Sequence, residues 1–469
     1  MTSMIEKLLK SARDNPYKIA YKIDDEKITY KELYSKSLYY SNLLKREGNK
    51  PVILYGHKEI NMIIGIISCI LANRTYIPVE LGTPSERIKE IMKISDASLV
   101  LTNHRIEDIK TTRLSTLENY KDKPIIENDN DIVYIIFTSG STGVPKGVPI
   151  SKENLDNFVR WISHNSTLSK YKGIKVLNNA SFSFDLSVAD LFYSLCNGHT
   201  LVAYSFNVVN DYDKIFEVYK KERIVFSVLT PTIAKLTLLN PNFNANNYPY
   251  LECLYFCGEQ LDKSLVNKLI GAFPKIKILN AYGPTEATSA VSMIRIKKNM
   301  LDKDYLPVGE VDKSATDIEI KSKEILLKGK SVFNGYLGMK SRNHYKENGV
   351  NCYKTGDVGF IDDNELYCLG RKDHQVKYKG FRIELGEIEN QLKSINKVKD
   401  AIVLSKQNDL GVITTIKAYV ITRLTEEEIK NELRKTLPYY MIPKSFVFLK
   451  RFPINKNGKV DRKELSKLW

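Results

Sequence analysis

The sequence predicts an α/β protein with a large N-terminal domain and a small, mobile α+β C-terminal domain. Short apolar runs of strand length alternate with segments of helical periodicity up to about residue 295, as in mixed, mostly parallel sheets sandwiched by helices. Beyond that point short strands and turns dominate, which predicts an antiparallel β subdomain. At 469 residues the chain is also longer than one hydrophobic core usually serves.

The N-terminal segments follow this alternation closely. Residues 28–33 are typical of a strand end running into a helix, and the apolar residues 62–71 predict a buried helix. That helix ends near Asn73, a residue type that tolerates the left-handed backbone of a helix end. The remaining predicted strands of this part are 52–55, 76–79 and 132–137, and a further helix begins at about residue 152.

From residue 175 onward, strands and helices succeed each other regularly. Strand, crossover helix and strand in series predict a largely parallel sheet with functional residues at the carboxyl ends of its strands. The expected strands are 175–178, 200–204, 224–228, 251–256 and 276–280, and the expected helices are 186–195, 212–221, 231–239 and 261–272.

A polar break at residues 371–375 predicts a hinge near Asp373 and therefore two domains, 1–372 and 373–469. Thr425 and Glu428 have the spacing of a capping box that opens a helix. The β subdomain before the hinge would use strands 324–329, 353–357 and 365–371, and the small domain a helix at 384–392 and strands at 401–404 and 413–420.

Composition narrows the classes of function. The longest apolar run, residues 62–72, is too short to span a bilayer, and no signal peptide is evident, so we expect a cytoplasmic protein without membrane insertion. A net charge of +16 favours an acidic partner. Its lysines are spread along the chain, which argues against nucleic-acid binding. Neither the six cysteines nor the six histidines have the spacing of a zinc site.

The loop after the strand at 132–137 has the composition of a phosphate cradle. Glycines let the backbone approach an anion, hydroxyls and N–H groups donate hydrogen bonds, and a lysine offsets charge. Its spacing is not that of a Walker A loop, and taken alone an ordinary surface turn is the alternative. The residues concerned are Thr138, Ser139, Gly140, Ser141, Thr142, Gly143 and Lys146.

Three further loops carry candidate residues. Asp185 stands at the entrance of an apolar helix, where the alternative is a simple N-cap. Lys459 lies in a glycine-containing loop, where a solvated charge is the alternative. A Gly-Pro turn flanked by an aromatic ring, a hydroxyl and an acid favours function over a mere connection; it consists of Asn280, Ala281, Tyr282, Gly283, Pro284, Thr285 and Glu286.

These motifs, in this order, resemble the adenylate-forming superfamily of acyl-CoA synthetases, luciferases and non-ribosomal peptide synthetase adenylation domains. The resemblance covers nearly the whole chain. Within the superfamily it is greatest to the D-alanine:D-alanyl carrier protein ligases and free-standing adenylation domains, through residues 181–187, 256–259, 282–288 and 331–338. The other matching stretches are 138–147, 353–357, 370–377, 380–389, 437–443 and 457–462.

The resemblance implies a two-step ligase that uses ATP and Mg²⁺. An amino acid is first converted to aminoacyl-AMP with release of pyrophosphate, and the aminoacyl group then passes to the phosphopantetheine thiol of an acidic carrier protein. Because no carrier sequence follows residue 469, we expect a separate carrier. By the same resemblance the small domain rotates at Asp373 between the steps and brings Gly380 to the pantetheine path.

Residue roles follow from the same resemblance. Lys459 would bridge the substrate carboxylate and the α-phosphate, Glu286 would hold Mg²⁺, and the hydroxyls of the loop at 138–142 would hold the β- and γ-phosphates. Asp357 suits the two ribose hydroxyls, with Arg371 nearby. Asn280 and Tyr282 would flank adenine.

Asp185 would pair with the substrate ammonium, which separates amino-acid activation from fatty-acyl activation. D-Alanine is the leading candidate, but Ala189, Ala281 and Ser289 depart from the D-alanine enzymes and allow a larger or more polar amino acid. The residues expected to line the substrate site are Leu186, Ala189, Val228, Tyr255, Cys257, Ala281, Ser289 and Ala290.

Two other classes of function stay open. The first is a free-standing adenylation enzyme of a natural-product pathway that uses another amino acid, or less readily an acyl-CoA ligase. The second is a non-catalytic binding protein that kept the fold, although the presence of Lys459, Glu286 and Asp357 argues against it.

Overall fold

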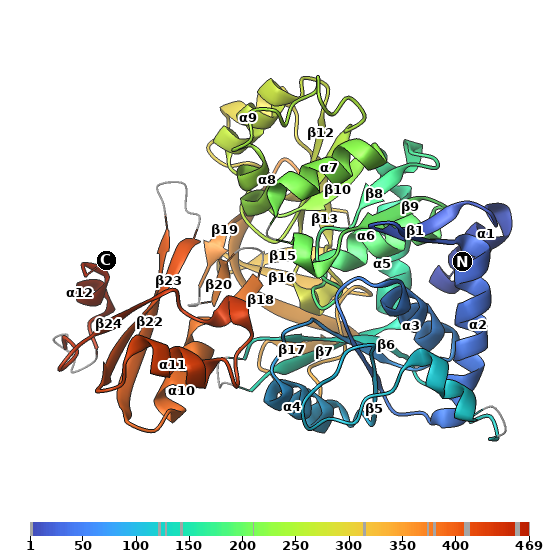
Figure 1. Ribbon diagram of the computed structural model, residues 1–469. Helices are drawn as coiled ribbons and strands as arrows, with labels where there is room; N and C mark the ends of the chain where they lie inside the picture. The colour runs from blue at the N-terminus through green and yellow to red at the C-terminus, as the bar shows by residue number, and fades with distance from the viewer. Residues whose placement is uncertain are drawn as a thin grey trace. The chain divides into compact units, whose positions relative to one another are not determined.

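The chain divides into two compact units (Figure 1). The first comprises Met1–Leu81, Met92–Ile136 and Gly147–Lys372, and the second Gly82–Ile91, Phe137–Lys146 and Asp373–Trp469. The second unit thus includes two short segments from the first half of the sequence. The predicted domain boundary at residue 373 would assign both segments to the N-terminal domain. The computed structural model describes residues 3–120, 123–126, 129–140, 144–209, 211–312, 316–372, 375–378, 381–407, 413–454 and 460–468.

An eight-stranded sheet, ordered β13-β12-β11-β10-β8-β9-β1-β2, forms the centre of the first unit. Its inner strands pair in parallel, and only the outer pairs β12–β13 and β1–β2 are antiparallel. The parallel α/β core predicted from the sequence is confirmed. The strands are β1 (Ile19–Ile23), β2 (Glu26–Thr29), β8 (Lys175–Leu177), β9 (Thr200–Ala203), β10 (Phe226–Leu229), β11 (Cys253–Phe256), β12 (Lys277–Tyr282) and β13 (Ser292–Arg295).

Helices cover both faces of this sheet (Figure 1). A hydrophobic core lies on each face, and successive residues of a strand belong alternately to one core and to the other. In β11, for example, Leu254 and Phe256 pack with α7, α8 and α9, whereas Cys253 and Tyr255 belong to the core that contains α5 and α6. The central strands of a parallel sheet buried on both faces are mostly apolar, and β11, with Cys253, Leu254, Tyr255 and Phe256, is an example. The helices are α5 (Lys152–His164), α6 (Leu186–Cys196), α7 (Tyr212–Glu222), α8 (Pro231–Thr237) and α9 (Lys263–Ala272).

A second sheet, ordered β5-β3-β4-β6-β7, shares the core that contains α5 and α6. Asn73 follows its helix α3 with a φ of 57°, which confirms the predicted left-handed residue. Strand β7 occupies residues where the sequence suggested only the end of a loop. The elements are α1 (Met4–Asp14), α2 (Tyr30–Glu47), β3 (Val52–Tyr55), α3 (Ile60–Leu71), β4 (Tyr76–Val79), α4 (Ser85–Ser95), β5 (Leu99–Leu101), β6 (Ile132–Thr138) and β7 (Lys146–Ser151).

The predicted β subdomain is an antiparallel sheet with the order β14-β19-β18-β16-β15, and β17 pairs with β18. Strand β18 pairs with β19 through residues 357–362, and its earlier residues pair with β16 and β17. The strands are β14 (Gly309–Glu310), β15 (Thr316–Lys321), β16 (Glu324–Gly329), β17 (His344–Glu347), β18 (Val350–Asp362) and β19 (Glu365–Arg371).

The second unit has a hydrophobic core of its own, drawn from residues between Val376 and Phe446. The Thr425 hydroxyl accepts a hydrogen bond from Glu428 N–H, and the Glu428 carboxylate accepts one from Thr425 N–H, so the predicted capping box is confirmed. The predicted hinge residue Asp373 lies outside the described residues, so the hinge stays a prediction. The elements are β20 (Gln375–Tyr378), β21 (Phe381–Glu384), α10 (Leu385–Ser394), β22 (Val398–Gln407), β23 (Ile413–Thr422), α11 (Glu426–Leu433), β24 (Ser445–Phe448) and α12 (Arg462–Ser466).

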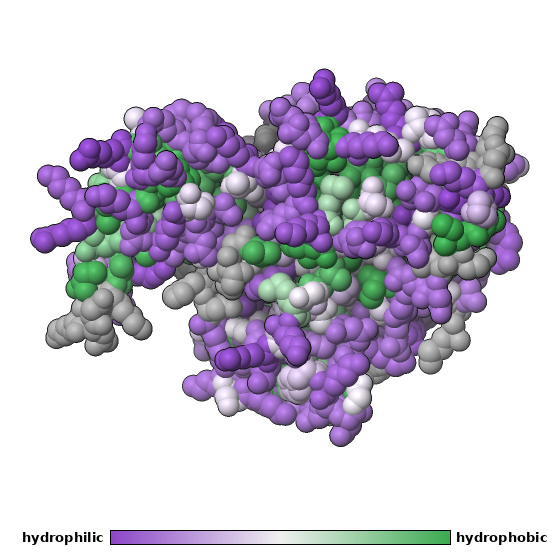
Figure 2. All heavy atoms as spheres, turned by 90° about the horizontal axis from the view of Figure 1, so that it is seen from below, coloured by the Kyte–Doolittle hydropathy of each residue, from purple (hydrophilic) through white to green (hydrophobic). Residues whose placement is uncertain are grey.

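Hydrophilic side chains cover most of the face drawn in Figure 2, and hydrophobic ones appear there in small patches. Among the described residues, none of the helices combines the length and the apolar character that crossing a bilayer requires.

Candidate functional site

Most of the predicted substrate-lining residues gather on one face of the eight-stranded sheet. Val228 and Tyr255 are register partners on β10 and β11, and Ala281 on the neighbouring β12 belongs to the same core as both. Ala189 on α6 faces them in that core and is fully buried. Leu186, at the start of α6, packs against the same cluster. Residues far apart in the sequence thus meet at the carboxyl ends of parallel strands.

The other lining residues lie where the chain leaves β11 and β12. The Cys257 thiol lies 3.9 Å from the carbonyl oxygen of Ser289, which joins the two loops. Gly283 is required there, because a Cβ at this position would lie 2.5 Å from Ala290 Cα. Ser289 itself adopts a φ of 72°, and Ala290 is buried.

Asp185 occupies the N-cap position of α6, but its side chain makes no capping hydrogen bond. Its charge instead contributes to the raised pKa of Tyr134 and of Tyr255, after the larger effect of burial. The carboxylate therefore lies close enough to both rings to act on them electrostatically. The N-cap alternative does not explain this acid.

Three buried hydroxyl groups near Asp185 and Cys257 lack a hydrogen-bond partner among the described residues. They belong to Tyr134, Tyr255 and Ser289, none of which is more than 2% exposed. Buried polar groups are nearly always paired, so such orphans indicate a place for a polar ligand or water. Tyr134, in the middle of β6, was not predicted from the sequence, because its strand context is typical of a core residue.

A second cluster forms around Asp357 on β18. The Tyr282 hydroxyl donates a hydrogen bond of 2.6 Å to Oδ2, and Arg371 Nη1 lies 3.0 Å from Oδ1. Burial and the Asp357 charge together raise the pKa of Tyr282 well above its usual value, which keeps this phenol a donor. Each carboxylate oxygen can accept two hydrogen bonds, so Asp357 retains acceptor capacity for two hydroxyls of a ligand. The predicted neighbours Asp357 and Arg371 are register partners on β18 and β19.

Most of the predicted turn at 280–286 is buried, and Gly283 and Pro284 are partly buried. Asn280 donates from Nδ2 to the Pro307 carbonyl at 2.8 Å, so its side-chain amide already holds a neighbouring segment. Glu286 is fully buried and accepts a 2.6 Å hydrogen bond from Tyr336. Mg²⁺ is usually held by one or two carboxylates together with substrate phosphates, and the Glu286 carboxylate fits that donor set. Pro284 and Thr285 complete the turn.

The described part of the predicted phosphate loop belongs to the second unit. Ser139 Oγ accepts from Glu384 N–H and donates to the Arg382 carbonyl. Gly140 N–H donates to Glu387 Oε2 at 2.9 Å, and Arg87 lies 2.8 Å from Glu387 Oε1. The Glu387 carboxylate therefore accepts a hydrogen bond from a backbone N–H group of the loop, as a phosphate group of a ligand would.

Thr138 and Lys146 are the residues at which β6 ends and β7 begins. Six predicted site residues lie outside the described part of the chain, and their roles stay predictions: Ser141, Thr142, Gly143, Asp373, Gly380 and Lys459. Sequence reasoning missed Tyr336 and Glu387, whose roles depend on contacts with residues 50 and 247 positions away.

Comparison with known proteins supports this picture. The AMP-binding enzyme family matches residues 8–337, and the AMP-binding enzyme C-terminal domain matches residues 387–459. The D-alanine–D-alanyl carrier protein ligase of Lactococcus lactis is 36% identical, over 99% of this chain and 98% of that protein. The Listeria welshimeri protein of the same name is 37% identical, over 99% of both chains.

Solved structures share the fold. The adenylation domain AlmE of Vibrio cholerae, in complex with glycyl-adenosine-5'-phosphate, superposes with a TM-score of 0.85 at 22% identity and covers 100% of this chain and 98% of its own. The o-succinylbenzoate CoA synthetase of Bacillus subtilis gives a TM-score of 0.83 at 21% identity, with 98% of both chains covered. From the matched family regions and the full-length relatives, the chain belongs to the AMP-binding enzyme family.

Proposed function

We propose that this protein is an AMP-forming ligase that activates a small amino acid with ATP and transfers it to a carrier protein. The observation that supports it best is Asp185, a carboxylate at the entrance of α6 that does not cap its helix and acts on the buried Tyr134 and Tyr255. A carboxylate surrounded by apolar side chains and by hydroxyls without a partner among the described residues can form an ion pair with the ammonium group of the substrate.

The first step joins the substrate carboxylate to the α-phosphorus of ATP and releases pyrophosphate. Since two anions must approach each other, catalysis rests on positioning and on cationic screening. Asp357 would accept the ribose hydroxyls while Tyr282 and Arg371 orient it. Lys459 would lie between the reacting carboxylate and phosphate. Glu286 would hold Mg²⁺, which screens the phosphate charge when bound.

D-Alanine is the proposed substrate, because the relatives that match over the full length of this chain are named D-alanine–D-alanyl carrier protein ligases. This chain departs from the expected D-alanine pattern at the buried Ala189 and Ala281 and at Ser289, whose hydroxyl has no hydrogen-bond partner among the described residues. These departures keep a slightly larger or more polar amino acid as the second candidate.

In the second step a phosphopantetheine thiol attacks the aminoacyl-AMP carbonyl, the aminoacyl–phosphate bond breaks and AMP leaves. The relatives' names suggest a separate D-alanyl carrier protein as the acceptor. The net charge of +16 would favour an acidic carrier, and association would then weaken as salt is added. Because the reaction consumes ATP, we expect it in the cytoplasm.

Exchange of labelled pyrophosphate into ATP tests this proposal directly. Exchange should appear with D-alanine and should be absent with propionate, which has the same carbon skeleton without the amine. A panel of D- and L-amino acids serves as the control for specificity. If no amino acid supports exchange, the ligase assignment is wrong, whereas exchange with another amino acid alone would select the second candidate.

Substitution of Lys459 tests the roles assigned to the two steps. Lys459→Ala should lower amino-acid-dependent exchange by at least about 100-fold, since it removes the cation between two anions. Transfer from pre-formed aminoacyl-AMP to the carrier should stay within about threefold of wild type. Equal loss of both activities would contradict the role assigned to Lys459.

A further inference from the structure

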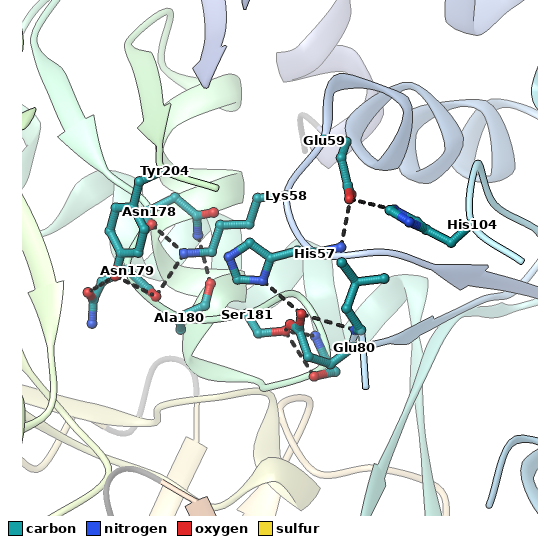
Figure 3. Close-up of polar contacts among 12 residues, drawn as sticks. His57, Lys58, Glu59, Glu80, His104, Asn178, Asn179, Ala180, Ser181 and Tyr204 are labelled. Carbon is teal, nitrogen blue, oxygen red and sulfur yellow. Dashed lines mark hydrogen bonds and ion pairs between the residues drawn. The ribbon is translucent and has the colours of Figure 1, made fainter. Parts of the chain in front are cut away.

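A buried polar network contacts residues 178–181, which lead into the turn that carries Asp185. Figure 3 shows the contacts of this network. It is built from residues that follow three different strands: His57 and Lys58 after β3, Glu80 after β4, and Ser181 after β8. Strands β3 and β4 are parallel neighbours in one sheet, and β8 belongs to the other. The network therefore joins the carboxyl ends of strands from the sheet β5-β3-β4-β6-β7 and from the eight-stranded sheet.

Glu80 is the centre of this network. His57 Nδ1 lies 2.7 Å from Glu80 Oε1, and the Ser181 hydroxyl donates to Glu80 Oε2. The Leu81 N–H also donates to Oε1, at 3.1 Å. Both His57 and Glu80 are less than 10% exposed, so the two groups face each other with little water between them. In such surroundings a charge-assisted hydrogen bond is strong, and its loss leaves a buried charge unpaired.

From Ser181 the contacts continue into the turn. The Ser181 hydroxyl lies 3.0 Å from the Ser183 hydroxyl and accepts a 3.3 Å hydrogen bond from Ser183 N–H. The Phe184 N–H donates to the Ser181 carbonyl at 3.0 Å. Asp185 is the next residue, and its carbonyl accepts from Val188 in the first turn of α6. The Ser181 side chain is thus the link between Glu80 and the backbone that presents Asp185.

Lys58 contacts the first residues of the loop that follows β8 and leads to this turn. Its ammonium group donates 2.9 Å hydrogen bonds to the carbonyls of Asn178 and Asn179 and lies 4.2 Å from the centre of the Tyr204 ring. Figure 3 shows the side chain extended toward these groups. Asp190 on α6 accepts from Asn178 Nδ2 at 3.0 Å, so the loop is fastened at this end as well.

The electrostatics agree with this geometry. Burial lowers the pKa of Lys58 to about 8, while the charges of Asp190 and Glu80 act in the opposite direction. Burial likewise raises the pKa of Asp190 to about 8. The two opposite charges favour each other, and Lys58 and Asp190 both hold Asn178 by hydrogen bonds, so this end of the loop is fixed between two buried charged groups.

We propose that Glu80, with His57 and Lys58, positions the turn that presents Asp185 and thereby sets the affinity for the amino-acid substrate. These are positioning residues, because they act through Ser181 and the loop backbone. The inference rests on the proposed role of Asp185. A displacement of about 1 Å in a binding group can cost up to about 100-fold in rate, so a network several residues away can control substrate use.

The test compares Ser181→Ala and Glu80→Gln with wild type in amino-acid-dependent pyrophosphate exchange. Both variants should raise the KM for the amino acid about 10-fold while the KM for ATP stays within about twofold. Ser181→Thr keeps the hydroxyl and should restore the wild-type KM. Unchanged KM values for the amino acid, or equal increases for the amino acid and ATP, would overturn the proposal.

Glu222→Gln is the matched control. Glu222 is also a buried acid of the first unit, 4% exposed, and it pairs with Lys22 and with Lys175 at the opposite, amino end of β8. Its loss should lower the melting temperature without a selective change in the amino-acid KM. A selective increase in the KM for the amino acid in Glu222→Gln would overturn the proposal, because the loss of any buried ion pair would then have the same effect.

Amide hydrogen exchange gives a reading that does not depend on activity. Exchange at residues 183–188 should become at least about threefold faster in Ser181→Ala and in Glu80→Gln than in wild type or Glu222→Gln. If the wild-type protein catalyses no pyrophosphate exchange, the proposed function is wrong. If amide hydrogen exchange at these residues is unchanged in both variants, the proposed positioning role of the network is wrong.

Discussion

At the scale of single residues, the chemistry of the site is carried by two acids in different surroundings. Asp357 is held between a phenol and a guanidinium, which orient it and leave acceptor capacity for a ligand. Asp185 stands at a helix end and acts on two buried tyrosines. One acid thus suits neutral hydroxyls, and the other suits a cation.

Asp185→Asn should raise the KM for the amino acid by at least about 100-fold, because the amide removes the charge that pairs with the substrate ammonium. The KM for ATP should change less than about threefold. Pyrophosphate exchange at varied amino-acid concentration measures the effect, with ATP titration as the control. An unchanged amino-acid KM would mean that the ammonium binds elsewhere.

Tyr282→Phe should raise the KM for ATP about 10-fold, since it removes the hydroxyl that donates to Asp357. The amino-acid KM should not change. Equilibrium binding of AMP to the purified protein gives an independent measurement. If AMP binds this variant as tightly as wild type, Tyr282 does not orient Asp357 for the nucleotide.

At the scale of elements, the loops after parallel strands do most of the positioning. Residues 282–291 turn back so tightly that Val291 N–H donates to the Tyr282 carbonyl at 2.8 Å. This fold depends on Gly283, where any side chain would meet backbone atoms of Ala290 and Ser289. Backbone atoms cannot rotate away as a side chain can, so the loop must shift if the glycine is replaced.

Gly283→Ala should therefore abolish most pyrophosphate exchange and lower stability, with a cost on the order of 1–3 kcal/mol from overpacking. Gly271→Ala is its matched control: no atom of the described residues lies within 4 Å of a Cβ there, and Gly271 is within α9. Alanine in a helix is favoured over glycine by about 1 kcal/mol, so this variant should be slightly more stable. Urea unfolding of both variants measures the difference; equal stabilities would argue against the close packing at Gly283.

At the scale of the whole molecule, stability depends on groups unrelated to the site. His199, between α6 and β9, is 1% exposed, and neither ring nitrogen has a hydrogen-bond partner among the described residues. Burial, helped by the charges of Lys18 and Lys172, lowers the pKa of His199 to about 3. Between that value and about 6.5 the unfolded chain binds more protons, so stability rises with pH across this window and is lost as pH falls.

His199→Leu should remove this dependence. On acidification from pH 7 to pH 5, the free energy of unfolding of the variant should fall by about 2 kcal/mol less than that of wild type. Urea unfolding at several pH values measures both. The difference between the two proteins should stay constant from pH 7 to pH 8, above the window. Equal losses of unfolding free energy in the variant and in wild type down to pH 5 would contradict a neutral, buried His199.

The order of amino acids was sufficient to predict the α/β class, the antiparallel β subdomain and the capping box at Thr425. Each of these depends on local periodicity or on short spacings, which are written directly in the sequence. Membership in the AMP-binding enzyme family also follows from collinear motifs. Glu286 stood out because it lies in a Gly-Pro turn after a predicted strand, Asp185 because it stands at the entrance of an apolar helix, and Asp357 through the family resemblance.

The tertiary structure decided what those residues contact. Only the folded chain shows that Asp185 does not cap its helix and that Tyr282 and Arg371 both reach Asp357. It also shows that Lys58 and Glu80 contact residues 178–181, just before the turn of Asp185. These contacts join residues 14 to more than 100 positions apart. Such pairings are set by strand pairing and by the packing of separate sheets, properties of the fold that no local pattern contains.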